Sequence, residues 1–247
     1  MAAIGICKVS TGGIGSFMRT LFELQLPTVP IADREGVWPV RRIYCVGRNY
    51  ADHAREMGAT GREPPFFFGK PADAVVPVAD GTEARVAYPP RTADLHHEIE
   101  LVVAIGVAGH CIPNAQALDH VLGYAIGIDL TRRDIQAELK RKGHPWEMAK
   151  AFDQSAPIGP IHLATACGHL QQGAVRLSVN GGDRQRGQLA DMIWPVPDLV
   201  AELSTYVELR PGDLVFTGTP AGVGALDRGD RVVAGIDGLG EMRLLIV

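Results

Sequence analysis

The apolar residues of this chain occur in short runs that mostly have the length of strands. The runs are bounded by glycine and proline, which commonly mark turns between strands. They predict strands within residues 41–47, 64–71, 96–106, 123–130, 209–224 and 229–247. Residues 174–187 also alternate between polar and apolar on both sides of Asn180-Gly181, which predicts a hairpin with a two-residue turn.

Helical patterns are fewer and shorter. They predict helices over residues 49–58, 112–123, 131–143 and 195–207. Asn114 and Thr131 are candidate N-caps, and Gly58 and Gly143 are candidate stops. Because these helices do not alternate regularly with strands as βαβ units do, the pattern favours a strand-dominated α+β fold.

The first 38 residues differ from the rest of the chain. Glycine and proline interrupt them repeatedly, and no sustained periodic pattern emerges. We interpret residues 1–38 as a variable lead-in, partly ordered on the surface, and residues 39–247 as one compact domain.

Composition excludes several classes of function. The net charge of −4 and the absence of a Lys/Arg tract argue against a nucleic-acid partner. No apolar run reaches the roughly 18 residues of a membrane span, and no secretory signal is evident, so we expect no membrane partner. The 4 cysteines are widely spaced without a C-x-x-C motif. We expect reduced, mostly buried thiols and a cytoplasmic location.

Two glutamates stand at the start of an apolar strand, in "LHHEIELVVAIG". Glu98 and Glu100 are two residues apart and therefore point to the same face of a strand. Their mutual repulsion is relieved by a divalent cation, and oxygen-only ligands favour Mg²⁺, Mn²⁺ or Ca²⁺. Asp129, the only charged residue of the strand at 123–130, is the candidate third ligand. The alternatives are a solvated strand edge paired with arginines, and a zinc site using the adjacent histidines, which the spacing disfavours.

Basic and amide side chains follow Asp129. Arg133, Gln136 and Lys140 have helical i, i+3, i+7 spacing and share one face, which suits an anionic substrate or a merely solvated surface. Lys150 is an isolated lysine in an apolar setting, with the same two readings.

A second candidate pair precedes the aromatic segment. His53 and Glu56 lie at i, i+3 on the first predicted helix, where a carboxylate can orient an imidazole for proton abstraction from water. An exposed surface pair is the alternative, and spacing alone favours it. The glycine-rich segment 216–224 matches no nucleotide-binding motif, so no nucleotide is expected.

Six ordered segments together resemble the fumarylacetoacetate hydrolase superfamily. They are "CVGRNYADHAREMG", "FFFGKPADAVV", "LHHEIELVVAIG", "GYAIGIDLTRRDIQ", "HPWEMAKAFDQSAPIGP" and "TGTPAGVG". Within the superfamily the chain is most similar to bacterial fumarylpyruvate hydrolases of gentisate breakdown, notably over residues 62–77.

The resemblance implies a mixed β-sandwich roll with short helices, forming a homodimer. It implies that Glu98, Glu100 and Asp129 bind Mg²⁺ or Mn²⁺, and that His53 and Glu56 activate water. It further implies a catalytic or oxyanion-stabilising role for Lys150. The residues that it implies for substrate contact are Arg133, Gln136, Lys70 and Thr219.

The expected substrate is a small 2,4-dioxo acid, and the expected reaction is hydrolysis of fumarylpyruvate to fumarate and pyruvate. Relatives with the same metal chemistry give the alternatives: an acylpyruvase, an oxaloacetate decarboxylase, or a diene isomerase or decarboxylase. A non-catalytic metal-stabilised binding module is a further alternative. For the second carboxylate of fumarylpyruvate, we expect Lys140 or Arg62 to supply the cation.

Overall fold

The computed structural model describes residues 21–51 and 63–247. In chain order its strands are β1 (Thr28–Pro30), β2 (Val37–Pro39), β3 (Arg42–Gly47), β4 (Phe66–Lys70), β5 (Val75–Pro77), β6 (Glu83–Val86), β7 (Leu95–His97), β8 (Ile99–Ile105), β9 (Val121–Ile128), β10 (Thr131–Arg132), β11 (Ala156–Ile158), β12 (His162–Leu163), β13 (Ala174–Val179), β14 (Gly182–Gln188), β15 (Asp213–Phe216), β16 (Gly224–Leu226), β17 (Arg231–Ile236) and β18 (Gly240–Ile246). The helices are α2 (Arg133–Lys142), α3 (Glu147–Lys150), α4 (Ala164–Cys167) and α5 (Val196–Tyr206), with 3₁₀ turns η1 (Ala72–Ala74), η2 (Asn114–His120) and η3 (Leu189–Asp191).

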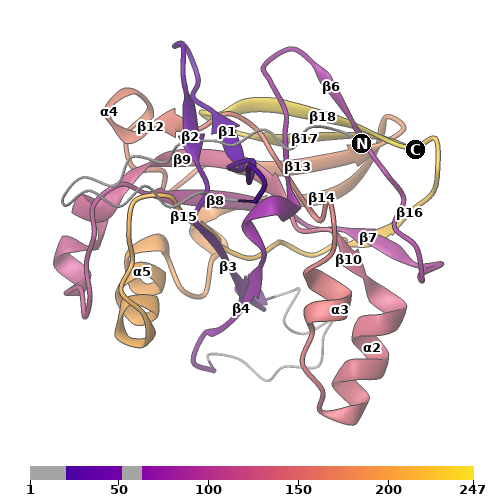
Figure 1. Cartoon of the computed structure of the whole chain (residues 1–247), viewed down its shortest axis with the longest axis horizontal. Coiled ribbons are helices and arrows are strands. Elements are labelled where there is room, and N and C mark those ends of the chain that lie inside the picture. The colour runs from indigo at the N-terminus through magenta and orange to yellow at the C-terminus, as the bar shows by residue number, and fades with distance from the viewer. Residues whose placement is uncertain (1–20, 52–62) are drawn as a thin grey trace.

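Two sheets pack face to face as a β-sandwich. The larger one has 8 strands in the order β4-β3-β15-β8-β9-β11-β5, with β12 added beside β9. The smaller one has 5 strands in the order β14-β13-β17-β18-β6, and Figure 1 shows β13 and β17 lying over β8 and β9. Alternate residues of the facing strands, such as Leu101 and Leu177, share one apolar core between the sheets. The observed fold therefore confirms the strand-dominated sandwich expected from the sequence.

The two central strands of the large sheet both continue into a third, 3-stranded sheet of order β10-β7-β16. Residues 96–106, predicted as one strand, are divided between β7 and β8 at Glu98. The partner strand is divided at Asp129, where β9 gives way to β10. The pairing continues across this corner, from Ile99 opposite Ile128 to His96 opposite Thr131. Two acidic residues are thus placed side by side where the chain changes sheets.

The other face of the large sheet has its own core. Val102 and Phe216 lie there with Val29, which comes from the short hairpin of β1 and β2. Part of the predicted lead-in is therefore packed against the sheet. The boundary at residue 39 remains a prediction.

The predicted hairpin at Asn180-Gly181 is confirmed, since both residues have the positive φ, 52° and 78°, that this turn requires. The helix over 195–207 is confirmed as α5, and Gly143 ends α2 with φ 66°.

Three local predictions are wrong. Thr131 does not cap α2, because it pairs with His96 in β10. Residues 114–120 form a 3₁₀ rather than an α-helix, and the Asn114 side chain donates a hydrogen bond to Asp198 instead of capping it. The expectation of mostly buried thiols also fails within the described residues, where Cys45 is buried, Cys167 half-buried and Cys111 exposed. No helix in the described part of the chain is long and apolar enough to cross a membrane.

Candidate metal centre and substrate pocket

The three predicted carboxylate ligands meet at the sheet corner. The backbone N–H of Asp129 donates to the carbonyl oxygen of Glu98 at 2.9 Å, which holds the two crossing points together. Glu100 lies two residues along β8. One carboxylate oxygen from each residue lies within 4.8 Å of the others. All three are buried, with exposed fractions of 5%, 2% and 1% for Glu98, Glu100 and Asp129.

Basic side chains surround only part of this acidic cluster. Lys150 Nζ lies 2.8 Å from Glu98 Oε2 and 2.7 Å from Asp129 Oδ2. Lys70 Nζ lies 2.8 Å from Asp129 Oδ1, close enough for an ion pair but without hydrogen-bond geometry. Arg133 pairs with the other oxygen of Glu98. The cations therefore neutralise Glu98 and Asp129 more directly than Glu100.

Glu100 has a different environment. Its Oε2 accepts a 2.7 Å hydrogen bond from the backbone N–H of Gly218. Burial raises the pKa of Glu100 well above its ordinary value, and the charges of Asp129 and Glu98 raise it further. For Lys150, burial opposes the charge, but Asp129 and Glu98 together raise its pKa above the ordinary lysine value. The site thus favours a cationic Lys150 and is short of positive charge at Glu100.

The donor set fits a hard divalent cation. The ligand atoms are carboxylate oxygens, which Mg²⁺, Mn²⁺ and Ca²⁺ prefer. The neighbouring histidines are engaged elsewhere: His96 contacts Asp94 and Arg133, and Nδ1 of His97 lies 2.9 Å from Gln185 Oε1. Within the described residues, the acidic triad is the group that could hold a metal, and it contains no histidine.

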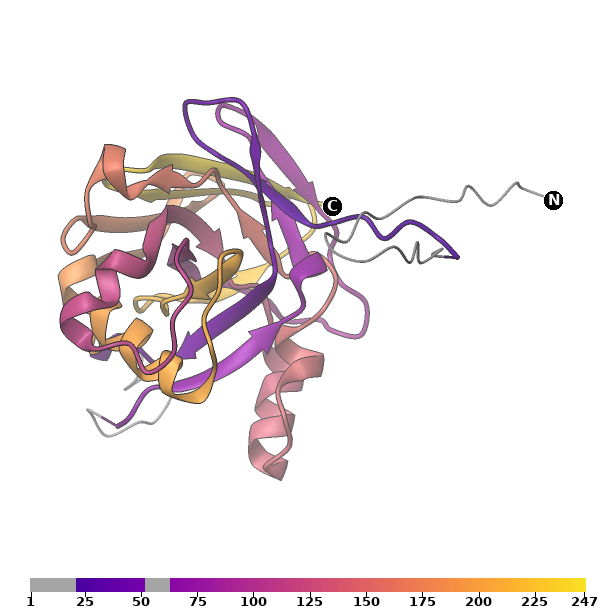
Figure 2. The same ribbon diagram turned by 60° about the vertical axis from the view of Figure 1, so that its left-hand side comes forward.

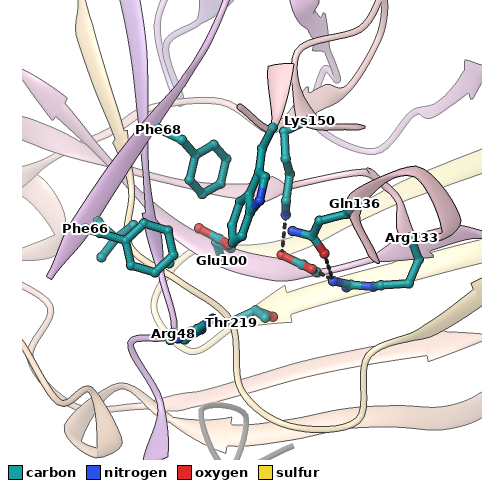
Figure 3. Close-up of a pocket in the computed structure, with 12 residues that line it drawn as sticks. Arg48, Phe66, Phe68, Glu100, Arg133, Gln136, Lys150 and Thr219 are labelled. Atoms are coloured by element: carbon teal, nitrogen blue, oxygen red, sulfur yellow. Dashed lines mark hydrogen bonds and ion pairs between the residues drawn. The ribbon is translucent and has the colours of Figure 1, made fainter. Parts of the chain in front are cut away.

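A pocket opens over the triad. Its lining residues are Val46, Gly47, Arg48, Phe66, Phe68, Glu98, Glu100, Arg133, Gln136, Trp146, Lys150 and Thr219. Figure 3 shows Lys150, Gln136 and Arg133 converging on the carboxylates from the side of α2 and α3. Arg133 also donates to the side-chain oxygen of Gln136. The structure therefore brings four of the predicted catalytic or substrate-contact residues to one cavity: Arg133, Gln136, Lys150 and Thr219.

The remaining predicted residues lie elsewhere. The Lys70 side chain has no exposed surface and donates to the carbonyl oxygens of Leu130 and Lys150. Lys70 thus lies behind Asp129 and does not line the pocket, and its substrate contact stays a prediction. Lys140 is exposed in the last turn of α2, which stands away from the sheets in Figure 2, and it does not line the pocket. His53, Glu56 and Arg62 lie outside the described residues.

Sequence reasoning missed four of the residues that line the pocket. Phe66, Phe68 and Trp146 form an aromatic wall, with Trp146 edge-on to both phenylalanines at centroid distances of 5.4 and 5.8 Å. Arg48 follows β3 directly. Asp129 was identified as the only charged residue of an apolar strand, whereas Arg48 lies just after the strand predicted over residues 41–47, which already carries two arginines. Its place directly after an apolar strand was the signal that could have identified it.

A buried hydrogen-bond network fixes Thr219. Its hydroxyl donates to the Ile99 carbonyl at 2.7 Å and accepts from Gln185 Nε2 at 2.7 Å. The Gln185 side-chain oxygen accepts from the Ile99 N–H at 3.1 Å and faces His97 Nδ1. His97 donates from Nδ1 to that oxygen, and burial lowers the pKa of the ring, which favours its neutral form. Gln185 thereby connects the loop after β15 to β7 and β8, the strands on either side of Glu98.

Comparison with known proteins agrees with this geometry. Residues 42–247 match the family model described as fumarylacetoacetate (FAA) hydrolase C-terminal. A crystal structure of fumarylpyruvate hydrolase from Pseudomonas aeruginosa, in complex with Mn²⁺ and pyruvate, is 56% identical with a TM-score of 0.91, covering 92% of this chain and 99% of that one.

Two curated relatives carry a different activity. The mitochondrial oxaloacetate tautomerase FAHD1 of Rattus norvegicus is 42% identical over 83% of this chain and 91% of its own length. The oxaloacetate tautomerase YcgM of Escherichia coli is 42% identical over 81% of this chain and 90% of its own length. The family match includes the sheet corner and the residues that line the pocket, and the chain belongs to the fumarylacetoacetate hydrolase family.

Proposed function

We propose that this protein is a metal-dependent hydrolase that cleaves the C3–C4 bond of a 2,4-dioxo acid, converting fumarylpyruvate and water to fumarate and pyruvate. The observation that carries the proposal is the buried triad beneath a pocket lined by Arg133, Gln136 and Lys150. The 56% identical Pseudomonas aeruginosa enzyme, solved with Mn²⁺ and pyruvate, supports both the metal and the substrate class.

Glu98, Glu100 and Asp129 would hold Mg²⁺ or Mn²⁺. When bound, such a cation supplies Lewis-acid stabilisation of negative charge on substrate oxygens. The protein's own groups supply orientation. Arg133 and the amide of Gln136 are suited to bind the carboxylate of the pyruvyl end, because a guanidinium presents parallel donors to a carboxylate.

Lys150 provides positive charge at the reacting carbonyl. Its ammonium group is held by Glu98 and Asp129, so it stays protonated and fixed in place. A preorganised cation of this kind stabilises the oxyanion that forms when water adds to C4.

The proposed base is His53, oriented by Glu56. One proton of water passes to the imidazole, and the hydroxide adds to the C4 carbonyl. Breaking the C3–C4 bond leaves the electron pair on C3, and protonation of the resulting enolate gives pyruvate. The hydroxyl remains on the acyl fragment, which leaves as fumarate.

Oxaloacetate tautomerisation is the second candidate, favoured by the two tautomerases at 42% identity. It uses the same binding of a 2-oxo acid but transfers a proton at C3 without adding water. If His53 serves only to activate water, its loss should abolish hydrolysis of fumarylpyruvate and leave tautomerisation of oxaloacetate intact.

A substrate panel tests the proposal. Purified protein with added Mn²⁺ or Mg²⁺ is assayed with fumarylpyruvate, acetylpyruvate and oxaloacetate, before and after treatment with a chelator. We expect fumarylpyruvate to have the highest kcat/KM, chelation to abolish turnover and Mn²⁺ to restore it. A preference for oxaloacetate without hydrolysis of either acylpyruvate would favour the tautomerase instead.

We further propose a cytoplasmic homodimer acting in aromatic catabolism, in keeping with the family resemblance. Light scattering coupled to gel filtration tests the assembly, with twice the chain mass of 26.5 kDa expected.

A further inference from the structure

Arg48 enters the pocket from a different side than Arg133. It follows β3, whereas Arg133 begins α2. Both residues line the same cavity, and in the view of Figure 3 Thr219 lies between them. The cavity therefore presents positive charge at two separate places.

The backbone holds Arg48 in this position. Its φ of 58° is uncommon for a residue with a side chain, and such conformations persist where the surroundings enforce them. The next residue, Asn49, is fully buried and donates to the carbonyl oxygens of Thr217 at 2.8 Å and Trp194 at 2.9 Å. It also accepts from the Trp194 N–H at 2.8 Å. The backbone next to Arg48 is thus held in place by a satisfied buried amide.

The charge of Arg48 is only weakly compensated. Lys150 and Arg133 both pair with the triad. Within residues 21–51 and 63–247, the carboxylate near Arg48 is Glu63, 3.9 Å away and itself 54% exposed. Nε of Arg48 is buried and has no hydrogen-bond partner in that same part of the chain. Buried donors are usually paired, so this one is available for an acceptor on a ligand.

An apolar wall adjoins this cation. The Phe66 ring lies 5.6 Å from the Arg48 guanidinium and packs edge-on against Trp146. Gly47 makes this arrangement possible, because a Cβ there would come 1.9 Å from the Phe66 ring. The chemistry fits a ligand with an anionic group at each end and a flat apolar segment between them.

We propose that Arg48 is a specificity-determining residue that binds the second carboxylate of a dicarboxylate substrate, at the end remote from Arg133. The inference rests on the proposed function and deepens it, since fumarylpyruvate carries this second carboxylate, whereas acetylpyruvate ends in a methyl group on C4 and has none. It replaces Lys140, which does not line the pocket, as the distal cation.

The test compares Arg48→Gln and Arg48→Lys with two substrates, fumarylpyruvate and acetylpyruvate, in Mn²⁺. Arg176→Gln is the matched control, because Arg176 is 52% exposed and pairs with Asp237 outside the pocket. Arg62→Gln and Lys140→Gln test the earlier candidates. We expect Arg48→Gln to lose about 10-fold or more in kcat/KM for fumarylpyruvate, mainly through KM, and less than about 3-fold for acetylpyruvate. Arg48→Lys should recover part of the loss, because it keeps the charge but not the planar fork.

Equal losses on both substrates, or a selective loss only in Arg62→Gln or Lys140→Gln, would overturn the assignment. A binding measurement separates it from the proposed reaction. Calorimetry with fumarate and with crotonate, which has a methyl group in place of one carboxylate, needs no turnover. If the wild type binds fumarate more tightly and Arg48→Gln removes that difference, the inference holds even where fumarylpyruvate is not hydrolysed. Equal binding of the two acids by the wild type would refute it.

Discussion

Two buried acidic sites in this protein differ in how their carboxylates are paired with basic side chains. At the start of β15, Asp213 is fully buried between two arginines. Arg41 donates to its two oxygens at 3.0 and 3.1 Å, and Arg42 donates to them at 3.2 and 2.9 Å. The Arg210 backbone N–H adds a further bond at 2.9 Å. One carboxylate is thus matched by more than one positive charge.

At the sheet corner, three carboxylates share a small space. Lys150, Lys70 and Arg133 are distributed over Glu98 and Asp129, while Glu100 has a backbone N–H and a strongly raised pKa. A fully paired buried carboxylate is typical of a structural contact, whereas a buried acid whose pKa is raised by burial and by neighbouring carboxylates, as for Glu100, indicates a site for a ligand. Our predictions test whether this difference separates stability from activity.

The largest expected effect is on activity, at Glu100. Glu100→Gln keeps the shape and can still accept from the Gly218 N–H, but it removes one anionic ligand. We expect turnover with Mn²⁺ to fall by about 100-fold or more, with weaker Mn²⁺ binding in calorimetry. In metal-free protein the melting temperature should stay the same or rise, because the substitution relieves repulsion. A lower metal-free melting temperature would place Glu100 with Asp213 as a structural acid.

The reverse outcome is expected at the arginine-paired site. Asp213→Asn leaves two guanidinium groups without their carboxylate, although Arg41 and Arg42 are 37% and 33% exposed and regain some hydration. We expect a loss of about 2–3 kcal/mol in the free energy of unfolding, measured by urea titration, with kcat/KM nearly unchanged. Unaltered stability would mean that the pairing contributes little net free energy.

A smaller effect on turnover is expected at Gln185, which joins β8 to the loop that carries Thr219. Gln185→Met has a similar shape but removes the bonds to Thr219 and Ile99. Because Gln185 does not line the pocket, it is a positioning residue. We expect about a 10-fold fall in kcat, with KM changed less. Gln185→Glu should not restore kcat, because a carboxylate cannot donate to Thr219. Gln172→Met, at an exposed position, is the control. A loss of stability alone, at unchanged kcat, would reduce Gln185 to a structural role.

The smallest effect is expected at an exposed acid–base pair. Lys142 and Glu138 lie one turn apart on α2, with side chains 48% and 53% exposed. Lys142→Ala should shift the melting temperature by no more than about 1 °C and leave activity unchanged, since solvent already screens this pair. A larger shift in melting temperature would show that an exposed ion pair can matter as much as a buried one, so burial would not explain why Asp213 and the acidic triad behave differently.

Part of this organisation was readable from the chain itself. Local patterns predicted the Asn180-Gly181 hairpin and α5, because turn chemistry and helical periodicity depend on neighbouring residues. The two-residue spacing of Glu98 and Glu100, with Asp129 ending the next strand, also identified the acidic triad. Turn residues with strong conformational preferences, and charged residues within apolar strands, were therefore recognisable from the sequence.

Other features depend on how distant segments meet. In sequence, Lys70 and Lys150 are equivalent isolated lysines, yet one is sealed behind Asp129 and the other lines the pocket. Gln185 lies in a polar hairpin strand with no sign that it is buried.

The amino-acid sequence determined which groups are available: three carboxylates beside apolar strands, and basic side chains near them in the chain. Only the tertiary structure decided their arrangement. Two strands are interrupted at Glu98 and Asp129, where the chain passes from the large sheet to the 3-stranded sheet. The end of β3 places Arg48 at the same cavity as the first residues of α2. The physical reason is that periodicity reports which face a side chain occupies, whereas distances between remote residues follow from strand pairing and sheet packing.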